Sequence, residues 1–383
     1  MSEPRQQRAS VSERQQRASV NEPRQQRASV SSATAEPLLV VEDLKTHFRT
    51  SRGLVRAVDG VSFTLERGRT LGIVGESGSG KTILSRSIMG LINSPNAVQS
   101  GNVRFKGTDV RALSKDERQH LWGREVAMVF QDPMTALNPV LRIGRQLTEH
   151  VRCHLGMDKA EAMAHAEHLL AEVGIPEPAR RLNEYPHQLS GGMRQRVMIA
   201  ISLACGPTLL FADEPTTALD VTIQAQILDL LAAEQRDRNM SLVLVTHDLG
   251  VVAGRTDDIA VMYAGRIVEK APTRRLFSQM KMPYTEALLK SIPRLDQPSH
   301  TRLQIIGGRP PDLLNPPKGC SFSPRCPYAK ARCHEEAPPL TEAEVPGHLY
   351  ACWYPVGSPE WQAAQRGDRV AVTDATQVAA GGN

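Results

Sequence analysis

A glycine-rich segment at residues 75–82 contains the residue types that can hold phosphate groups. It fits the pattern G-x-x-x-x-G-K-[ST] and reads, in order, Gly75, Glu76, Ser77, Gly78, Ser79, Gly80, Lys81 and Thr82. Glycines let the backbone wrap closely, so that successive N–H groups can face phosphate oxygens. Lys81 can reach the β- and γ-phosphates, and the Thr82 hydroxyl can bind Mg²⁺. The segment therefore predicts a site for a nucleoside triphosphate and Mg²⁺.

Two adjacent acids, Asp213 and Glu214, follow the apolar run at residues 209–212. Consecutive residues of a strand point to opposite faces, so we expect the two carboxylates to do different jobs. Asp213 would hold Mg²⁺ through water, and Glu214 would polarise the attacking water. Because buried acids are costly without a cation, this pair favours catalysis over a purely structural role.

Short apolar runs and helical segments alternate around these motifs. The run at 71–74 ends at the glycine-rich segment, and a helix is expected at 81–91. Further strands are expected at 209–212 and 242–246, with a helix at 221–239 between them. Strands that alternate with helices predict a parallel sheet in an α/β domain. Strand-like segments also begin at residue 38 and occur at 61–65, and residues 158–173 have helical spacing.

Composition and charge narrow the class of protein. The 383 residues are 40 % hydrophobic and 23 % charged, which is ordinary for a globular protein. The net charge of +5 is weak evidence for a polyanionic partner, so we expect no nucleic-acid binding. Neither an apolar run of membrane-spanning length nor a signal segment is present, which predicts a cytoplasmic chain unless a partner holds it at a membrane.

The first thirty residues repeat one polar unit three times, each copy ending in Arg-Ala-Ser-Val. The unit has no hydrophobic face to stack, so we predict a disordered tail over residues 1–36. The repeated serines could be phosphorylated, and the excess of arginine could contact anionic lipid weakly. The simplest interpretation is a tail without an essential role.

The segment LSGGMRQR at 189–196 resembles the LSGGQ signature of ABC ATPases, with Met193 in place of the usual glutamine. Gln131 matches the Q-loop of that family, and His247 matches the H-loop. Ala218, Leu219 and Asp220 match the D-loop. The resemblance covers nearly all of the chain that we expect to be ordered. It implies an ABC-type P-loop fold with a RecA-like core, an antiparallel β subdomain and a helical signature subdomain.

The resemblance also implies roles for these residues. Lys81, Glu214 and His247 would be catalytic, with His247 on the γ-phosphate of ATP, and Gln131 would join Thr82 and Asp213 at Mg²⁺. In the family, the signature serves the nucleotide of the opposite subunit. Because the chain has one phosphate loop and one signature, a homologous ATPase subunit is expected as partner. The remaining nucleotide-site residues would be Phe48, stacked on adenine or else a packing residue, and Ser190, Gly191, Gly192 and Asp220.

Three segments, at 130–139, 185–200 and 212–231, closely resemble the ATP-binding subunits of dipeptide and oligopeptide permeases. This implies ATP hydrolysis coupled to peptide import at the cytoplasmic face of the membrane. The implied partners are two integral permease subunits and, indirectly, an extracytoplasmic substrate-binding protein. Importers of nickel, haem, glutathione or opines remain alternatives. So do a soluble ABC ATPase acting on ribosomes or DNA and a nucleotide sensor with an inactive site.

Four cysteines follow the spacing C-x5-C-x6-C-x18-C near the C-terminus. Thiolates suit zinc or an iron–sulfur cluster, and free thiols or a disulfide are the remaining reading. The resemblance implies a [4Fe–4S] cluster held by Cys320, Cys326, Cys333 and Cys352. Cys153 and Cys205 are expected to be packing residues.

Changes in composition along the chain set the expected domain boundaries. The nucleotide-binding domain is expected at 37–283. Proline, glycine and cysteine become frequent after it, which favours a small cysteine-rich domain at 284–356. The Ala-, Gly- and Gln-rich end at 357–383 predicts a flexible tail.

Overall fold

The computed structural model describes residues 36–216, 220–292 and 306–366. Residues from Pro37 onward belong to one compact unit. The N-terminal repeats, Ala218 and Leu219 of the predicted D-loop, and residues 367–383 lie outside the described residues. What the sequence predicts for them therefore stays a prediction.

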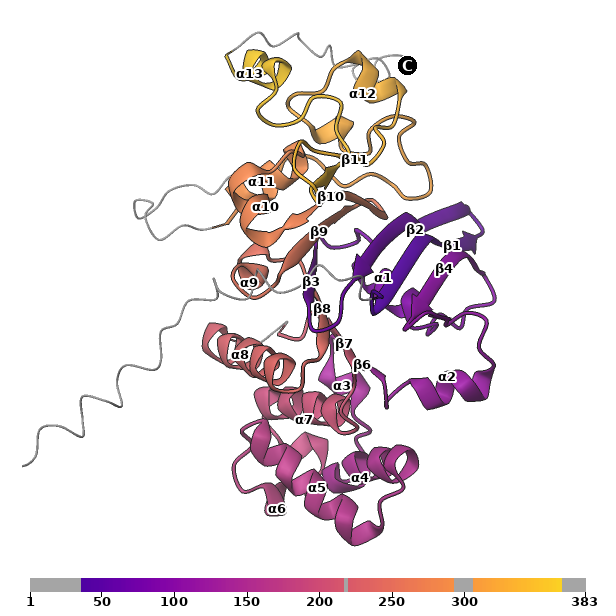
Figure 1. The fold of residues 1–383 in the computed structure, drawn as a ribbon, viewed down its shortest axis with the longest axis vertical. Helices are drawn as coiled ribbons and strands as arrows, with labels where there is room; N and C mark the ends of the chain where they lie inside the picture. Colours follow the sequence, from indigo (N-terminus) through magenta and orange to yellow (C-terminus); the bar gives the residue numbers. More distant parts are fainter. Residues whose placement is uncertain (1–35, 217–219, 293–305, 367–383) are drawn as a thin grey trace, which may run out of the picture. The chain divides into compact units, whose positions relative to one another are not determined.

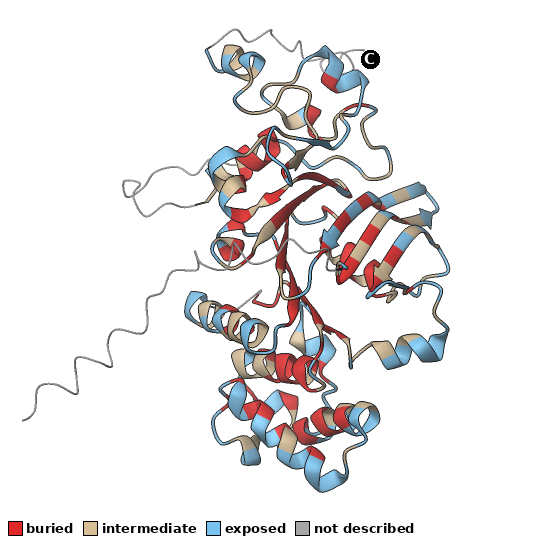
Figure 2. Cartoon of the chain, viewed as in Figure 1, coloured by how far each residue is buried: buried red, intermediate tan, exposed pale blue. Residues whose placement is uncertain are grey.

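The centre of the fold is an eight-stranded sheet with strand order β11-β12-β10-β9-β3-β8-β7-β6 (Figure 1). The five strands of its parallel part are β3 (Thr70–Val74), β6 (Val126–Val129), β7 (Leu209–Asp213), β8 (Ser241–Thr246) and β9 (Asp258–Tyr263). Every residue of β3, β7 and β8 is buried, as expected for parallel strands covered on both faces (Figure 2). The α/β fold with a parallel sheet is confirmed.

A second, four-stranded antiparallel sheet packs beside the first (Figure 1). Its order is β2-β1-β4-β5, with β1 at Leu39–Thr50, β2 at Gly53–Leu65, β4 at Ala97–Phe105 and β5 at Thr108–Asp109. Burial alternates along β2 near its end, so one face contributes Val61, Phe63 and Leu65 to an apolar cluster. Leu84 and Ile88 of helix α1 (Lys81–Ile88) belong to the same cluster. This sheet therefore buries one face of the helix that follows the glycine-rich segment.

Helices α4 to α7 gather into one helical group below the sheet in Figure 1. The buried stripes of α4, α5 and α7 share an apolar core that includes Ile143, Leu147, Leu169 and Val197. Asp158 caps α5 with a capping box, which explains why the helix predicted at 158–173 starts where it does. The bounds are α4 Ile143–Leu155, α5 Lys159–Glu172, α6 Pro178–Arg181 and α7 Gly191–Leu203. Two short helices precede them, α2 (Lys115–Leu121) and α3 (Pro133–Ala136).

The later helices return to the large sheet. Helix α8 (Val221–Asp237) forms within the predicted range of 221–239. It is followed by α9 (Leu249–Val252), strand β10 (Arg266–Pro272), α10 (Thr273–Gln279) and α11 (Pro283–Lys290). No helix in the described part of the chain is long and apolar enough to cross a lipid bilayer.

The C-terminal segment joins the same sheet. Leu349 and Tyr350 of β12 (Leu349–Tyr350) pair with Lys270 and Glu269 of β10. Strand β11 (Thr341–Glu342) pairs in turn with β12, and the short helices η3 (Ser323–Arg325) and α12 (Ala331–Glu335) precede them. The segment expected as a small domain at 284–356 therefore extends the central sheet.

The predicted flexible tail differs from the structure at its start. Helix α13 (Pro359–Gln365) occupies its first residues. Ser358 caps this helix by accepting from the Trp361 amide, and Pro359 suits its first turn. The Trp361 ring lies 5.8 Å from the Tyr328 ring, measured between centroids. The cap and the ring contact account for this helix, which composition alone did not predict.

Candidate nucleotide site

The glycine-rich segment lies between the end of β3 and the start of α1 (Figure 1). Gly80 occupies the N-cap position with φ at 101°, in the left-handed region that favours glycine. A Cβ atom there would also clash with the Ala57 carbonyl oxygen. The strand–loop–helix context that the motif requires is therefore present, and the loop is tightly packed from behind.

Lys81 is almost fully buried beneath this loop, at 5 % exposure. Its Nζ donates to the carbonyl oxygens of Gly75 and Glu76 at 2.8 and 3.0 Å. Burial lowers the pKa of Lys81, although the carboxylates of Glu214 and Asp213 act against that change. The buried Ser79 hydroxyl has no hydrogen-bond partner among the described residues. The Ser79 hydroxyl is therefore available to donate a hydrogen bond to a bound phosphate.

Asp213, at the end of β7, is fully buried beside the first turn of α1. The Thr82 hydroxyl donates to its Oδ1 at 3.1 Å, whereas Oδ2 has no partner in the described part of the chain. Burial raises the pKa of Asp213, and the hydrogen bond from Thr82 opposes this. A carboxylate oxygen left without a partner next to a hydroxyl is a donor set that fits Mg²⁺.

Glu214 stands between two residues from neighbouring strand ends. Its Oε2 accepts from Gln131 Nε2 at 3.1 Å, and its Oε1 lies 3.2 Å from Nδ1 of His247. Gln131 follows β6, and His247 follows β8, so the carboxyl ends of adjacent parallel strands bring these residues together. Glu214 has φ at 46°, an uncommon backbone for a non-glycine residue and one that clusters at functional sites.

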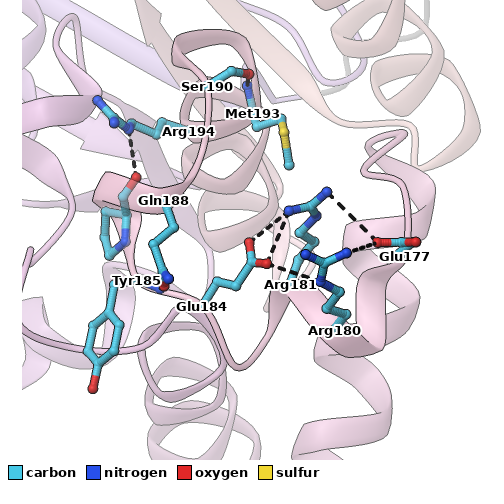
Figure 3. Close-up of polar contacts among 10 residues, drawn as sticks. Glu177, Arg180, Arg181, Glu184, Tyr185, Gln188, Ser190, Met193 and Arg194 are labelled. Carbon is cyan, nitrogen blue, oxygen red and sulfur yellow. Dashed lines mark hydrogen bonds and ion pairs between the residues drawn. The ribbon is translucent and has the colours of Figure 1, made fainter.

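The signature residues form the start of helix α7. Ser190 is the N-cap and accepts from the Met193 amide at 3.3 Å. Arg194 Nε donates to the Pro186 carbonyl at 2.7 Å and fastens the first turn to the preceding loop (Figure 3). Gly191 and Gly192 occupy the first two helical positions, where N–H groups can face an anion.

Local ion pairs lie within and beside α6, ahead of the signature, and Figure 3 also shows them. Arg181 pairs with Glu184 at 2.9 Å, and Arg180 pairs with Glu177 at the same distance.

Asp220 caps the neighbouring helix α8. Within the described residues, no hydrogen bond or ion pair joins the signature at 190–192 to the phosphate loop at 75–82. The structure thus joins Thr82 to Asp213 and joins Gln131 and His247 to Glu214, but it does not join the signature residues to the phosphate loop.

Phe48 lies on β1, opposite Val55 and Ala97, and is partly buried. The contact between Phe48 and adenine stays a prediction.

The four C-terminal cysteines line one small cavity, together with apolar and aromatic side chains that include Met282, Phe322 and Trp353. Burial raises the pKa of Cys326 to about 12 and raises that of Cys320 and Cys352 as well. In the described ranges, no group of three or more His, Cys, Asp or Glu side chains is arranged as a metal site. The four cysteines therefore converge on one cavity, but they are not arranged as a metal site, and the [4Fe–4S] cluster stays a prediction.

The two other cysteines differ from each other. Cys205 is partly buried, and burial raises its pKa to about 11. Cys153 is exposed on α4, whose buried stripe runs through Ile143, Leu147 and Val151. The prediction that Cys153 is a packing residue is therefore wrong.

Sequence reasoning missed two residues that contact the phosphate loop. Arg325 pairs with the Glu76 carboxylate, and the Tyr284 hydroxyl accepts from the Glu76 amide. No local pattern marked either one, because both lie more than 200 positions away along the chain. The spacing of the nearby cysteines indicates a functional segment, but it gives no signal for Arg325.

A phosphate loop above a buried lysine, a carboxylate pair at the end of the adjacent strand and a serine-capped signature helix define an ATPase of the ABC class. A family model described as ABC transporter matches residues 58–217. A second, described as oligopeptide/dipeptide transporter, C-terminal region, matches residues 268–333. The chain belongs to the ATP-binding subunits of dipeptide and oligopeptide ABC transporters, and it is an ATPase.

Individual relatives agree with this assignment. The dipeptide transport ATP-binding protein DppD of Escherichia coli is 49 % identical over 319 residues, which are 83 % of this chain and 97 % of that protein. The oligopeptide transport ATP-binding protein OppD of Salmonella typhimurium is 50 % identical over 329 residues, 86 % of this chain and 97 % of the relative.

A solved structure is similar in fold. It is a dimeric ATP-binding cassette in a post-hydrolysis state with ADP and Pi bound, superposed with a TM-score of 0.56 at 26 % identity. The match covers 62 % of this chain and 99 % of that one.

Proposed function

We propose that this chain powers the import of dipeptides or oligopeptides by binding and hydrolysing ATP against permease subunits. The observation that carries the proposal is the position of Glu214, fixed between Gln131 and His247 beside the Thr82–Asp213 pair. The names of the relatives supply the substrate class, since they are dipeptide and oligopeptide transport proteins.

Each residue of the phosphate loop has a proposed role. The backbone N–H groups at 75–82 surround the β- and γ-phosphates, and Lys81 neutralises their charge. Thr82, Gln131 and Asp213, the last through water, would hold Mg²⁺, which supplies charge neutralisation between the phosphates. Phosphoryl transfer depends mostly on positioning and charge, so these residues prepare the site before any bond breaks.

Glu214 is proposed to orient and polarise the attacking water. Its carboxylate is held in place by contacts from Gln131 and His247. His247 is half exposed, so it can contact the γ-phosphate when ATP is bound. Gln131 would then sense whether the γ-phosphate is present, because it reaches the same carboxylate.

A second ATPase subunit is proposed to complete the site. Ser190, Gly191 and Gly192 form a helix N-terminus suited to phosphate, yet they make no polar contact with this chain's own phosphate loop within the described residues. We assign them, with Asp220, to the nucleotide bound by the partner. A homologous subunit that faces this one would give two such composite sites.

Two integral permease subunits are the proposed partners in the membrane, reached from its cytoplasmic face. Large apolar side chains are exposed directly after β6: Phe130 at 37 %, Met134 at 61 % and Val140 at 75 %. This segment with exposed apolar side chains flanks Gln131 in the sequence, and exposed apolar surface is typical of interaction sites. The segment is therefore suited to transmit nucleotide state to a permease. An extracytoplasmic binding protein would deliver the peptide without contacting this chain.

We also propose the domain boundaries expected from the sequence, with residues 37–283 binding nucleotide and 284–356 forming a small cysteine-rich domain. The four cysteines are proposed to hold a [4Fe–4S] cluster, because four thiols share one cavity and thiolates suit iron–sulfur chemistry. Visible absorbance of the freshly isolated complex tests this, since an iron–sulfur centre is brown, whereas zinc and free thiols are colourless.

The test of the proposed function uses the assembled complex in lipid vesicles. Uptake of a labelled dipeptide should require ATP and the binding protein, and it should stop when Lys81→Ala is introduced. Uptake of nickel, haem, glutathione or an opine in place of peptide would contradict the substrate assignment. Stable association with ribosomes instead of permeases would contradict the transport function.

A further inference from the structure

Arg325 is a buried arginine whose donors are all used. Its side chain is 3 % exposed. Its guanidinium binds the Glu76 carboxylate through two bonds, Nη1 to Oε2 at 2.6 Å and Nη2 to Oε1 at 2.9 Å. The other three N–H groups donate to Tyr263 Oη at 3.3 Å, the Ile306 carbonyl at 3.2 Å and the Gly307 carbonyl at 2.9 Å. Bidentate arginine–carboxylate pairs of this kind fix geometry as well as charge.

Glu76, the second residue of the phosphate loop, is held at three points. Arg325 binds its carboxylate, Lys81 donates to its carbonyl oxygen, and its amide donates to the Tyr284 hydroxyl at 2.9 Å. The backbone of the loop at this residue is thus set by groups from the C-terminal part of the chain as well as by Lys81. A shift of Arg325 would move the backbone that faces the phosphates.

The position of Arg325 is in turn set by the cysteine-rich segment. It is the last residue of η3, and Cys326 follows it directly. The Cys320 amide donates to the Cys333 carbonyl at 2.7 Å, and the Ser323 amide donates to the Cys320 carbonyl at 2.9 Å. The short helix that carries Arg325 therefore lies between Cys320 and Cys326. Backbone hydrogen bonds of Cys320 fix the start of this helix.

An aromatic cluster connects this helix with the large sheet. Phe322 packs against Tyr263 of β9 and Tyr284 of α11, with ring centroids 5.4 and 5.3 Å apart. The two tyrosine rings lie 4.5 Å from each other, and their hydroxyls contact Arg325 and Glu76 respectively. Packed rings transmit displacements because protein interiors are dense.

We propose that Arg325 is a positioning residue for the phosphate loop, and that it couples the conformation of the cysteine-rich segment to ATP binding. This inference rests on the proposed function, in which the loop binds ATP. The coupling runs from the cysteines through η3 and Arg325 to Glu76. By linkage it acts in both directions, so that bound ATP also orders the cysteine-rich segment.

The experiment measures ATP affinity and backbone hydrogen exchange in the full-length chain. Arg325→Met should weaken MgATP binding by roughly tenfold, within the range usual for coupled sites. Arg309→Met, at an exposed arginine of the same segment, is the matched control and should bind like wild type. Arg325→Lys should recover part of the affinity, since it keeps the charge but not the bidentate geometry.

Hydrogen exchange distinguishes coupling from a merely structural contact. In wild type, MgATP should slow exchange of the amides at 320–333, and this effect should disappear in Arg325→Met. Glu76→Gln should reproduce both effects from the other side of the pair. The double variant should lose less than the sum of the single losses, because both changes remove the same interaction.

Two results would overturn the inference. One is wild-type ATP affinity in Arg325→Met, and the other is an ATP-dependent exchange difference that persists without Arg325. If Arg325→Met does not fold, the same two readouts in Glu76→Gln decide. A wild-type chain that binds ATP with this coupling but supports no peptide uptake would refute the proposed function alone.

Discussion

Nδ1 of His247 lies 3.2 Å from Oε1 of Glu214, although the two residues follow different strands, β8 and β7. The pair links the residue that would face the γ-phosphate to the carboxylate that would face the attacking water. It exists because β7 and β8 are adjacent and parallel, so that their carboxyl ends meet.

Replacing His247 should slow hydrolysis more than it weakens binding. His247→Ala removes a contact to the developing charge and frees the Glu214 carboxylate, so kcat should fall by about 10²-fold. The measurement is steady-state ATP turnover of the assembled complex, with KM determined in parallel. His334→Ala, at an exposed histidine of α12, is the control and should retain full turnover. An unchanged kcat in His247→Ala would remove this residue from the mechanism.

Asp213 should make the stability of the Mg²⁺-free chain depend on pH. Burial raises the pKa of Asp213 in the folded state above its unfolded value. The folded chain therefore binds more protons than the unfolded chain between those two values, and stability falls as pH rises through that window. Denaturant unfolding at several pH values, without Mg²⁺, should show a fall that Asp213→Asn diminishes. A pH dependence identical in the variant would contradict this assignment.

Two glycines of the phosphate loop should differ in their tolerance of a methyl group. Gly78 and Gly80 both have positive φ, but a Cβ at Gly78 meets no atom within 4 Å, whereas one at Gly80 meets the Ala57 carbonyl. Gly78→Ala should cost about 1 kcal/mol from backbone strain alone. Gly80→Ala should cost clearly more, because strain and a backbone clash add. Chemical denaturation of both variants checks the order, and equal losses would show that the clash is relieved.

The buried pair of Glu269 and His348 should stabilise the junction with the C-terminal segment. The side chains are 0 % and 1 % exposed, 2.8 Å apart, and Glu269 also accepts from the Lys281 and Met282 amides. His348→Ala should cost about 3–5 kcal/mol, as expected when one partner of a buried pair is removed.

The exposed pair of Arg332 and Glu336 is the matched comparison. Arg332→Ala should cost about 0–1 kcal/mol for the lost ion pair and about 0.5–1 kcal/mol for the lost contact with the Trp353 ring. Similar unfolding free energies for Arg332→Ala and His348→Ala would show that the buried Glu269–His348 pair stabilises the fold no more than an exposed ion pair does.

Much of the site was predictable because its signals are local. The phosphate loop, the acids after an apolar run and the serine before α7 are each encoded within a few residues. Their assembly follows from parallel strands that share one edge. Gln131 and His247, by contrast, rested on family resemblance, since a single glutamine or histidine has no local pattern.

Other features depend on contacts that no local pattern contains. Arg325 meets Glu76 across 249 positions, and only the packing of the whole sheet brings them together. The pairing of β12 with β10 joins the C-terminal segment to the core through two-residue strands, which are too short to read from periodicity. The burial of Cys153 could not be predicted from the sequence. The mixed composition of α4 does not indicate which face of the helix is buried, because that depends on the elements that pack against it.

The most direct test is ATP turnover by the assembled complex that carries Glu214→Gln. This change keeps the shape of the side chain and removes the charge that would polarise water. The account predicts ATP binding close to that of wild type and a loss of turnover of about 10²- to 10⁴-fold. Glu336→Gln, at an exposed glutamate, should leave turnover unchanged. Wild-type turnover in Glu214→Gln would contradict the central claim.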